Sequence, residues 1–481
     1  MKNLAFLLLL ILFLPINHGC KVADENPPNI VIIFADDQGY SDIGVFGAEG
    51  FTTPNIDAMA TAGRKFTDFH VASPVCSPSR AALLTGCYPQ RVGIPAVLFP
   101  EHLNTEWKPE QRSTKTGLHA DELTIAEMLR ANGYATGCFG KWHLGHHEQF
   151  LPLQQGFDEY YGIPYSNDMR PGKIPGKTPY PPLPMMDGNE IDHTLPDDQS
   201  MVTREYTEKA VDFIKRHQDE PFFVYLPHTM PHIPLFVSEK FAGKSANGIY
   251  GDVIEEIDWS VGQINKTLKE LDLEDNTLVI YTTDNGPWLI FGEHGGSARP
   301  LREGKFTTFE GGMRVPCVMK WPGNIPEGTI CDDLSSTIDL LPTIAAITGS
   351  EMSANKIDGL DISSLLLNVQ PESPVREEYF YYNNWQLQAV RKGPWKLHLP
   401  HNYHHVIKSD KGNKYGMKGM RVDIELSLFN LTEDIGETNN IADLHPEIVD
   451  DLLKLAEKMK TELGDSEKTG SGKRESGWER R

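Results

Sequence analysis

Short apolar runs that alternate with helical segments constrain the fold of this 481-residue chain most strongly. Residues 29–35 form a run rich in β-branched side chains, and similar runs occupy residues 222–226 and 278–283. Before the third run, apolar residues between positions 253 and 268 recur at helical spacing. Strands that alternate with helices over most of the chain predict an α/β fold, with a large, mainly parallel sheet covered by helices on both faces.

A change in composition near residue 375 predicts a second, smaller domain. The large sheet is expected within residues 27–375. Short aromatic runs followed by a helical pattern predict a small antiparallel sheet with a C-terminal helix in residues 376–465. Residues 171–196 are rich in Pro and Gly and are expected to form a long surface loop. The polar residues 466–481 are expected to be a disordered tail.

Residues 1–19 have the pattern of an export signal. A short basic start precedes an apolar run that is too short to span a bilayer as a mature helix. The glycine directly before Cys20 is similar to a bacterial lipobox, in which the cysteine is lipidated, although Asn17 and His18 match that pattern poorly. A signal peptide that is simply cleaved is the alternative. Both readings predict export to the periplasm or the cell surface, with membrane attachment only through a lipid on Cys20.

Charge and cysteine content restrict the functions open to this chain. Acidic residues outnumber basic ones by 67 to 45, and a net charge of −22 argues against binding to nucleic acid. An anionic substrate would therefore need a local cluster of cations. Besides Cys20 there are five cysteines, an odd number whose spacing matches no disulfide framework or zinc site. Cys138 and Cys317 lie in apolar stretches and are expected to be small buried side chains. Cys76 does not fit that interpretation.

The sequence around Cys76 predicts an anion site at the start of a helix. Ser77 is a suitable N-cap, and Pro78 suits the first helical turn. Free N–H groups and the helix dipole favour an anion at such a position. Arg80, one turn into the helix, adds a permanent cation whose fork of N–H groups suits a tetrahedral oxyanion.

Two acidic pairs each follow a predicted strand. Asp36 and Asp37 come after the first strand, and Asp284 and Asn285 come after a later one. Ligand sites in parallel sheets form beyond the carboxyl ends of the strands, so the two pairs can converge. Alone, the first pair would more often be a solvated turn. Together the pairs offer three carboxylates and an amide oxygen, a ligand set suited to Ca²⁺.

The segment that begins at Cys76 also carries a family resemblance. Cys76-Ser77-Pro78-Ser79-Arg80-Ala81-Ala82-Leu83-Leu84-Thr85-Gly86 is similar in full to C-x-P-S-R-x-x-L-L-T-G, the signature of type I sulfatases, whose cysteine is oxidised to formylglycine. Further segments resemble motifs of that family in the same order, over about residues 28–463. They are Gly140-Lys141-Trp142-His143-Leu144-Gly145, Gly162-Ile163-Pro164-Tyr165-Ser166, Pro231-His232-Ile233-Pro234 and Gly304-Lys305 with Glu310-Gly311-Gly312.

The chain thus resembles the arylsulfatase A and N-acetylgalactosamine-6-sulfatase branch of the alkaline phosphatase superfamily. The resemblance implies an alkaline-phosphatase-like fold, sulfuric ester hydrolase activity and a sulfated carbohydrate substrate, with algal polysaccharides or glycosaminoglycans as candidates. It also implies a maturation partner, either a formylglycine-generating enzyme or an anaerobic sulfatase-maturating enzyme. One Ca²⁺ ion is implied, with Asp36, Asp37, Asp284, Asn285 and residue 76 as its ligands.

The same resemblance assigns roles to the remaining site residues. Asp284 would take the proton of the nucleophile, His232 with Lys305 would protonate the leaving alcohol, and His143 would act in the second step. Arg80 and Lys141 would complete the cationic surroundings of the sulfate. Lys141, Ser166, His232 and Lys305 would bind the substrate. Histidines outside these motifs are interpreted as structural or solvated, namely His146, His147, His228, His404 and His405.

Two other functions remain open at this point. One is a phosphate or phosphonate monoesterase of the same superfamily, some of whose members also use formylglycine. The segment with Lys141 and His143 and the ligand set for a single metal favour sulfate over phosphate. The other is a surface lipoprotein that binds sulfated glycans without turning them over, which the complete catalytic set disfavours.

Overall fold

A ten-stranded mixed sheet forms the centre of the computed structural model, which describes residues 27–101, 114–171, 180–367 and 373–478. The predicted export signal, residues 1–19, and the candidate lipidation site Cys20 lie outside the described residues. In sheet order the strands are β12 (Thr329–Cys331), β2 (Arg64–Phe66), β11 (Cys317–Lys320), β10 (Thr277–Thr283), β1 (Asn29–Ala35), β9 (Phe222–Pro227), β5 (Ala135–Phe139), β6 (Glu159–Gly162), β7 (Pro184–Asp187) and β8 (Glu190–Thr194).

The middle of this sheet is parallel. Strands β10, β1, β9, β5 and β6 all run in the same direction, whereas β11 and β7 run antiparallel to their neighbours. The side chains of β1 alternate between two apolar cores: Ile30, Ile32 and Phe34 face one, and Val31 and Ile33 face the other. Such a fully apolar strand is stable only with both faces covered, and the predicted mainly parallel sheet is confirmed.

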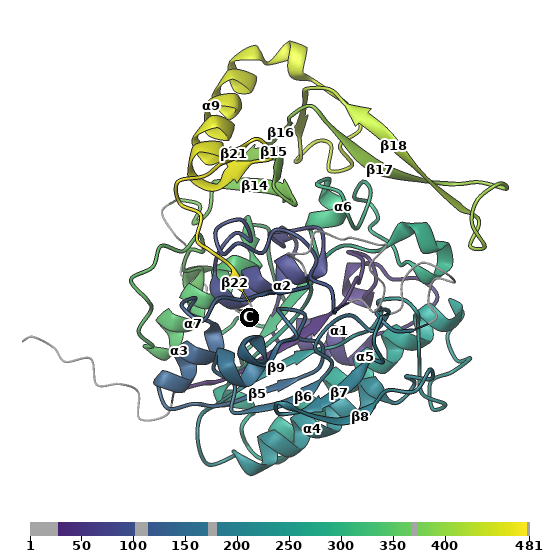
Figure 1. The fold of residues 1–481 in the computed structure, drawn as a ribbon, viewed down its shortest axis with the longest axis vertical. Coiled ribbons are helices and arrows are strands. Elements are labelled where there is room, and N and C mark those ends of the chain that lie inside the picture. Colours follow the sequence, from purple (N-terminus) through teal and green to yellow (C-terminus); the bar gives the residue numbers. More distant parts are fainter. Residues whose placement is uncertain (1–26, 102–113, 172–179, 368–372, 479–481) are drawn as a thin grey trace, which may run out of the picture.

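Helices cover both faces of the sheet (Figure 1). One face packs against α2 (Cys76–Thr85), α3 (Ile125–Ala131), α7 (Leu340–Thr348) and α8 (Ser363–Leu366). The other packs against α1 (Pro54–Thr61), α4 (Val202–Arg216) and α5 (Gly248–Glu270). None of the helices within the described ranges is long and apolar enough to cross a membrane.

The C-terminal part forms a second, antiparallel sheet of β14 (Glu378–Asn383), β15 (Gln386–Lys392), β16 (Trp395–His398) and β19 (Ser427–Asn430). Helix α9 (Pro446–Leu463) packs on it, so the predicted small sheet with a helix is confirmed. Between β16 and β19 the chain makes a long two-stranded ribbon, β17 (His401–Lys408) with β18 (Met417–Ile424), which projects from the molecule (Figure 1).

The remaining elements are short. The strands are β3 (Phe69–His70), β4 (Thr116–Gly117), β13 (Ser335–Ser336), β20 (Gly464–Asp465), β21 (Lys468–Thr469) and β22 (Gly477–Trp478). The helical turns are α6 (Glu310–Met313), η1 (Gly44–Phe46), η2 (Glu148–Phe150), η3 (Pro152–Gln155), η4 (Glu274–Asn276), η5 (Leu289–His294), η6 (Thr337–Asp339) and η7 (Ala442–Leu444).

Two segments differ from the sequence-based expectation. The described part of the expected loop at residues 171–196 contains the hairpin β7–β8, which extends the edge of the large sheet. The tail expected to be disordered from residue 466 is ordered as far as Trp478. There Arg474 forms an ion pair with Glu122 at 2.6 Å, and β22 pairs with β4. Composition alone does not reveal these partners, because they lie more than 300 residues away in the chain.

Candidate functional site

Cys76 is the first residue of α2 and is buried. The N-cap is Val75, which provides no capping side chain, so the prediction that Ser77 caps this helix is wrong. Ser77 lies inside the first turn, and its hydroxyl instead accepts a hydrogen bond from the backbone N–H of Leu98 at 3.1 Å. Burial raises the pKa of the Cys76 thiol, although the nearby cations Lys141 and Lys305 lower it.

The two acidic pairs meet because their strands are neighbours. Ala35 at the end of β1 pairs with Thr283 at the end of β10, and the acidic residues follow directly. The backbone N–H of Asp37 donates to Asp284 Oδ1 at 3.1 Å, and Asn285 Nδ2 donates to Asp37 Oδ1 at 2.7 Å. Asp36, Asp37, Asp284 and Asn285 are all buried, and they lie together beyond the carboxyl ends of β1 and β10.

Each of the three carboxylates contacts a buried cation. Arg80 donates two hydrogen bonds to Asp284 Oδ2, at 3.0 and 2.8 Å. The ammonium group of Lys141 donates to Asp36 Oδ2. Lys305 Nζ lies 2.8 Å from Asp37 Oδ2. We call these six residues, Asp36, Asp37, Asp284, Arg80, Lys141 and Lys305, the catalytic cluster.

Two oxygens at this site remain unsatisfied. Asp36 Oδ1 and Asn285 Oδ1 are buried and have no hydrogen-bond partner among the described residues. Burial raises the pKa of Asp37 and raises that of Asp284 to about 7, the latter with help from the neighbouring Asp36 carboxylate. For Asp36 the cations Lys141 and Arg80 outweigh burial and lower the pKa. Buried, unpaired oxygens from carboxylate and amide groups are the environment that a hard divalent cation requires.

The histidines of the site are held in defined tautomers. His143, which follows β5, has its Nε2 2.9 Å from the carbonyl oxygen of Leu98. Since a carbonyl only accepts, Nε2 carries the proton and Nδ1 presents a lone pair; Nδ1 has no partner in the described structure. Burial and the Lys141 charge lower the pKa of His143 well below its usual value. His232 likewise donates from Nδ1 to the Ile233 carbonyl at 2.7 Å, with Nε2 3.6 Å from Asp37 Oδ2.

Five parallel strands position most of the predicted site residues, whereas Cys76 and Arg80 belong to α2 and Lys305 lies between η5 and α6. Lys141 and His143 follow β5, His232 follows β9, and Ser166 follows β6, where its hydroxyl lies 3.3 Å from Lys141 Nζ. The structure brings these residues together with the acidic pairs after β1 and β10. In contrast, Nε2 of the buried His228 lies 3.0 Å from Ser260 Oγ, and His405 Nδ1 lies 2.6 Å from Glu303 Oε1.

One residue beside the site is missing from the sequence-based set. The ring of Trp288 lies 5.5 Å from the ring of His232, and Lys305 Nζ lies over its face at 4.4 Å. Trp288 is half-buried. Its position four residues after Asp284 is the only sequence signal, because a single tryptophan has no motif.

Comparison with known proteins identifies the family. The sulfatase family model matches residues 28–350, and the model of the C-terminal region of aryl-sulfatase matches residues 374–478. The chain belongs to the sulfatase family. It is therefore a sulfuric ester hydrolase with an alkaline-phosphatase-like fold. Sulfatases generally use a metal ion, and the unsatisfied oxygens of Asp36 and Asn285 fit that requirement.

Similar proteins cover most of this sulfatase. Arylsulfatase A from Bos taurus is 38% identical over 462 residues, which are 91% of this chain and 88% of the relative. N-acetylgalactosamine-6-sulfatase from Sus scrofa is 40% identical over 384 residues, 78% of this chain and 72% of the relative. The crystal structure of Ps i-CgsB in complex with k-i-k-neocarrahexaose superposes with a TM-score of 0.74 at 30% identity, covering 90% of this chain and 93% of the other.

Proposed function

We propose that this sulfatase removes sulfate from a sulfated carbohydrate through a formylglycine made from Cys76. The observation that carries the proposal is the position of Cys76. Its side chain is buried at the N-terminus of α2, where the charges of Lys141, Lys305, Asp36 and Asp284 all act on it. A thiol whose pKa is raised is a poor nucleophile, whereas a hydrated aldehyde at this position offers two hydroxyl groups on one carbon.

In the first step, one of these hydroxyls attacks the sulfur of the ester. Asp284 takes the proton of that hydroxyl, and Arg80, Lys141 and Lys305 stabilise the negative charge on the sulfate oxygens. Asp36, Asp37, Asp284, Asn285 and residue 76 would hold one Ca²⁺ ion. When bound, this ion lowers the pKa of the attacking hydroxyl and neutralises charge on the sulfate.

The bond between sulfur and the ester oxygen then breaks, and the alcohol leaves. His232 is the proposed acid, because its Nδ1 is fixed by the Ile233 carbonyl and its Nε2 faces Asp37. With Nδ1–H held by the carbonyl, the acid is the doubly protonated ring, whose Nε2 proton converts the departing alkoxide to a neutral alcohol and leaves the ring neutral. Lys305, which contacts Asp37, supports this transfer with its positive charge.

The second step releases the sulfate that is now bound to residue 76. His143 removes the proton from the remaining hydroxyl, the carbonyl of the aldehyde re-forms, and the bond to sulfate breaks. The lone pair on Nδ1 and the neutral state of the buried ring suit His143 to act as this base. Addition of water to the aldehyde then restores the hydrate.

The carbohydrate substrate is supported by the relatives. One is named N-acetylgalactosamine-6-sulfatase, and the solved structure of Ps i-CgsB is a complex with k-i-k-neocarrahexaose. The resemblance of residues 1–20 to an export signal with a lipobox supports a location outside the cytoplasm. Formation of the aldehyde requires a formylglycine-generating enzyme or an anaerobic sulfatase-maturating enzyme as a partner.

The test measures sulfate release from matured protein together with the mass of the peptide that contains residue 76. Wild type should release sulfate and show the loss of mass expected when cysteine becomes formylglycine. Cys76→Ala should release none, while Cys331→Ala, at another buried cysteine, should be active. Full activity with an unmodified Cys76, or preference for phosphate or phosphonate esters, would contradict the proposal.

A further inference from the structure

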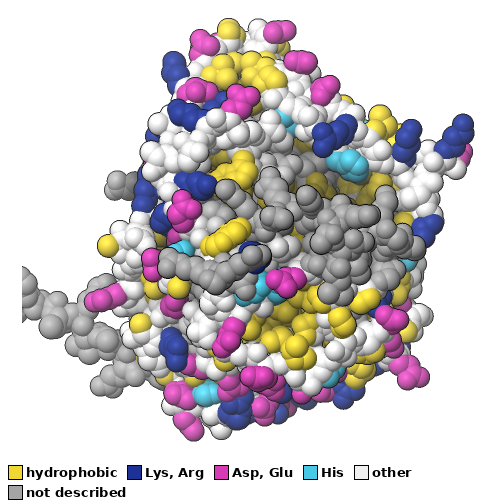
Figure 2. All heavy atoms as spheres, viewed as in Figure 1, with side chains coloured by type: hydrophobic (Ala, Val, Ile, Leu, Met, Phe, Trp, Pro, Cys, Tyr) yellow, Lys and Arg dark blue, Asp and Glu magenta, His cyan; other side chains and the backbone are white. Residues whose placement is uncertain are grey.

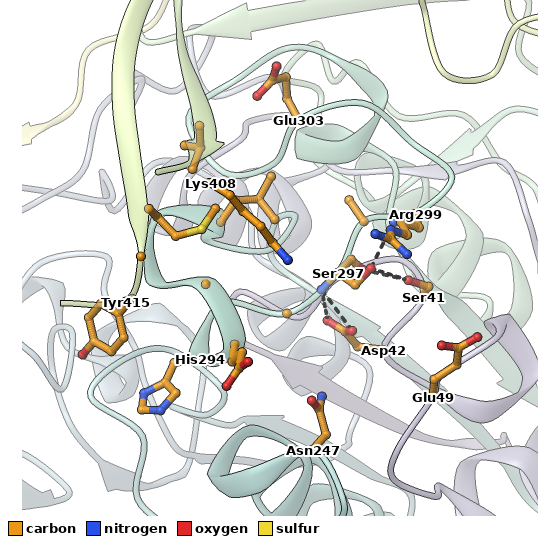
Figure 3. A pocket seen from close by; sticks show the side chains of 18 of the residues that line it. Ser41, Asp42, Glu49, Asn247, His294, Ser297, Arg299, Glu303, Lys408 and Tyr415 are labelled. Atoms are coloured by element: carbon orange, nitrogen blue, oxygen red, sulfur yellow. Dashed lines mark hydrogen bonds between the residues drawn. The ribbon is translucent and has the colours of Figure 1, made fainter. Parts of the chain in front are cut away.

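A cavity of about 1430 Å³ lies outside the catalytic cluster, between the ribbon β17–β18, η5 and the loop that follows β1 (Figure 3). No member of the catalytic cluster lines it, and its volume exceeds the ~300–1,000 Å³ of ordinary small-molecule pockets. The lining is polar and mixed in charge, with Asn247, Ser297, Arg299, Lys408 and Tyr415 among its side chains. The cavity therefore suits an extended polar ligand better than a compact apolar one.

A row of aromatic rings connects this cavity with the catalytic acid. The ring of Trp288 lies 5.5 Å from that of His232 and 4.8 Å from that of Phe291. Phe291 in turn lies 5.2 Å from Tyr415, at the tip of the ribbon. Trp288, Phe291 and Tyr415 are each half-buried, so each keeps part of its surface accessible. We call these three residues the aromatic track.

The tip of the ribbon is docked firmly on η5. Asn413 Nδ2 donates to the Ile290 carbonyl at 2.7 Å. Gly292 has φ of 55°, and a Cβ atom there would lie 2.8 Å from the carbonyl oxygen of Tyr415. The close approach requires glycine at this position. The wall of the cavity is therefore already formed, which reduces the ordering cost of binding.

The ribbon is basic although the chain is acidic. Residues 401–424 contain five Lys or Arg and two Asp, against 45 basic and 67 acidic residues in the whole chain. Figure 2 shows Lys and Arg side chains gathered on this projection. Lys408 reaches from the ribbon into the cavity toward Ser297 (Figure 3).

Two acidic residues of the cavity already have partners. Asp42 accepts hydrogen bonds from the N–H of Gly39 at 2.8 Å and from the hydroxyl of Tyr250 at 2.6 Å. Glu303 Oε1 lies 2.6 Å from His405 Nδ1, within hydrogen-bond distance. Three further acidic residues, Glu49, Glu293 and Asp410, line the cavity and are exposed, as are Lys408 and Lys414 of the ribbon. The cations that the ribbon offers to an anionic ligand therefore stand beside acidic side chains.

We propose that the aromatic track and the basic ribbon bind the sugars attached to the sulfated residue, so that the preferred substrate is a sulfated glycan chain of several sugars. The proposal rests on the proposed function and specifies its substrate class. Aromatic rings offer flat apolar surfaces to the C–H faces of sugars while their edges stay hydrated. Lys408 and Lys414 offer charge to sulfate groups further along the chain.

Kinetics with substrates of increasing length test this proposal. The substrates are p-nitrophenyl sulfate and size-defined carrageenan and chondroitin 6-sulfate oligosaccharides, from disaccharide to hexasaccharide. For the glycan that wild type desulfates, KM should fall with length. Lys408→Ala/Lys414→Ala and Tyr415→Ala should each raise KM for the hexasaccharide about 5- to 10-fold. Turnover of p-nitrophenyl sulfate should stay unchanged, and the length effect should shrink at high salt.

The control is Lys266→Ala/Lys454→Ala, which removes two exposed charges on α5 and α9 and should change neither KM. The proposal would be overturned if KM did not depend on substrate length, or if the control variant raised KM for the hexasaccharide as much as Lys408→Ala/Lys414→Ala does. Neither result would contradict sulfatase activity itself. Calorimetry on Cys76→Ala with the hexasaccharides separates the two hypotheses. Affinity that depends on Lys408 and Lys414 supports the glycan site even where wild type releases no sulfate, a result that would overturn only the proposed function.

Discussion

Two buried ionic clusters in this sulfatase hold equal numbers of charges but differ in how their oxygens are satisfied. The catalytic cluster has three carboxylates and three cations. The second cluster lies where the large domain meets the C-terminal sheet, and we call it the seam cluster. Its members are Asp68, Glu310, Glu437, Arg314, Arg391 and Lys396, and all of them are buried.

Every carboxylate oxygen of the seam cluster has a donor. Arg391 donates to both oxygens of Asp68, at 2.9 and 2.6 Å. Glu310 contacts Lys396 at 2.9 Å and the Tyr381 hydroxyl at 3.0 Å through Oε1, and His70 through Oε2. The oxygens of Glu437 contact His398 and the Glu310 N–H. Burial alone would raise the pKa of Glu310. The charges of Lys396 and His70 outweigh burial and hold this pKa well below its usual range.

Formal charge therefore does not identify the metal site. One ligand atom each from Asp68, His70 and Glu310 lie within 4.8 Å of one another, as do ligand atoms of Asp36, Asp37 and His232. Of these two clusters, as far as the structure describes them, the catalytic one with its neighbour Asn285 leaves buried oxygens without donors, at Asp36 and Asn285, and the seam cluster leaves none. Between the two clusters, unsatisfied oxygens rather than the number of acids distinguish the candidate metal site from a structural network.

The largest difference in catalytic rate is expected between variants of His232, beside the catalytic cluster, and of His398, beside the seam cluster. His232→Ala should lower kcat/KM for sugar sulfates by ~10²–10⁴, because an alcohol is a poor leaving group without a proton donor. Activated aryl sulfates, whose phenolates leave without protonation, should lose far less. His398→Gln, at a residue that contacts Glu437 of the seam cluster, should change neither rate by more than a few-fold. Steady-state kinetics on both substrate classes check this, and equal losses on both for His232→Ala would show that the acid is misassigned.

The seam cluster should matter for stability rather than chemistry. Glu310→Gln leaves Lys396 with fewer partners in a buried site and should lower the free energy of unfolding by about 3–5 kcal/mol. Urea unfolding measures the change. Asp451→Asn, which removes an exposed pair with Lys454 on α9, should change it by less than about 0.5 kcal/mol. A Glu310→Gln protein that is as stable as wild type but inactive would contradict the claim that the seam cluster acts on stability and not on catalysis.

A smaller effect is expected in how the stability of the folded chain depends on pH. Burial lowers the pKa of His398 to about 4, so it stays neutral in the folded chain while unfolded histidine protonates near pH 6.5. The unfolded state then binds more protons, and His398 should cost about 3 kcal/mol of stability as pH falls from 6.5 to 4. Unfolding of His398→Gln, which keeps a donor for Glu437, should depend less steeply on pH over that range. Identical slopes for both proteins would contradict this assignment.

Much of the fold and site could be predicted because its signals are local. The apolar run of β1, the acidic pair after it and the segment from Cys76 are each contiguous in sequence. The seam cluster joins residues from position 68 to position 437, and no short segment signals it. The ribbon β17–β18 also went unpredicted, since its strands are polar and mostly exposed. Trp288 can be assigned to the site only from its contacts with His232 and Lys305, which the sequence does not show.

Calcium binding to metal-free protein tests the central claim most directly. Calorimetry on chelator-treated wild type should show one Ca²⁺ per chain. Asp36→Asn, which removes the charge beside an unsatisfied oxygen, should weaken binding on the order of 100-fold and abolish turnover while the protein stays folded. The folded fraction of the Glu310→Gln protein should bind Ca²⁺ with the same affinity as wild type. Binding that survives Asp36→Asn but is lost in Glu310→Gln would place the metal in the seam cluster and contradict this account.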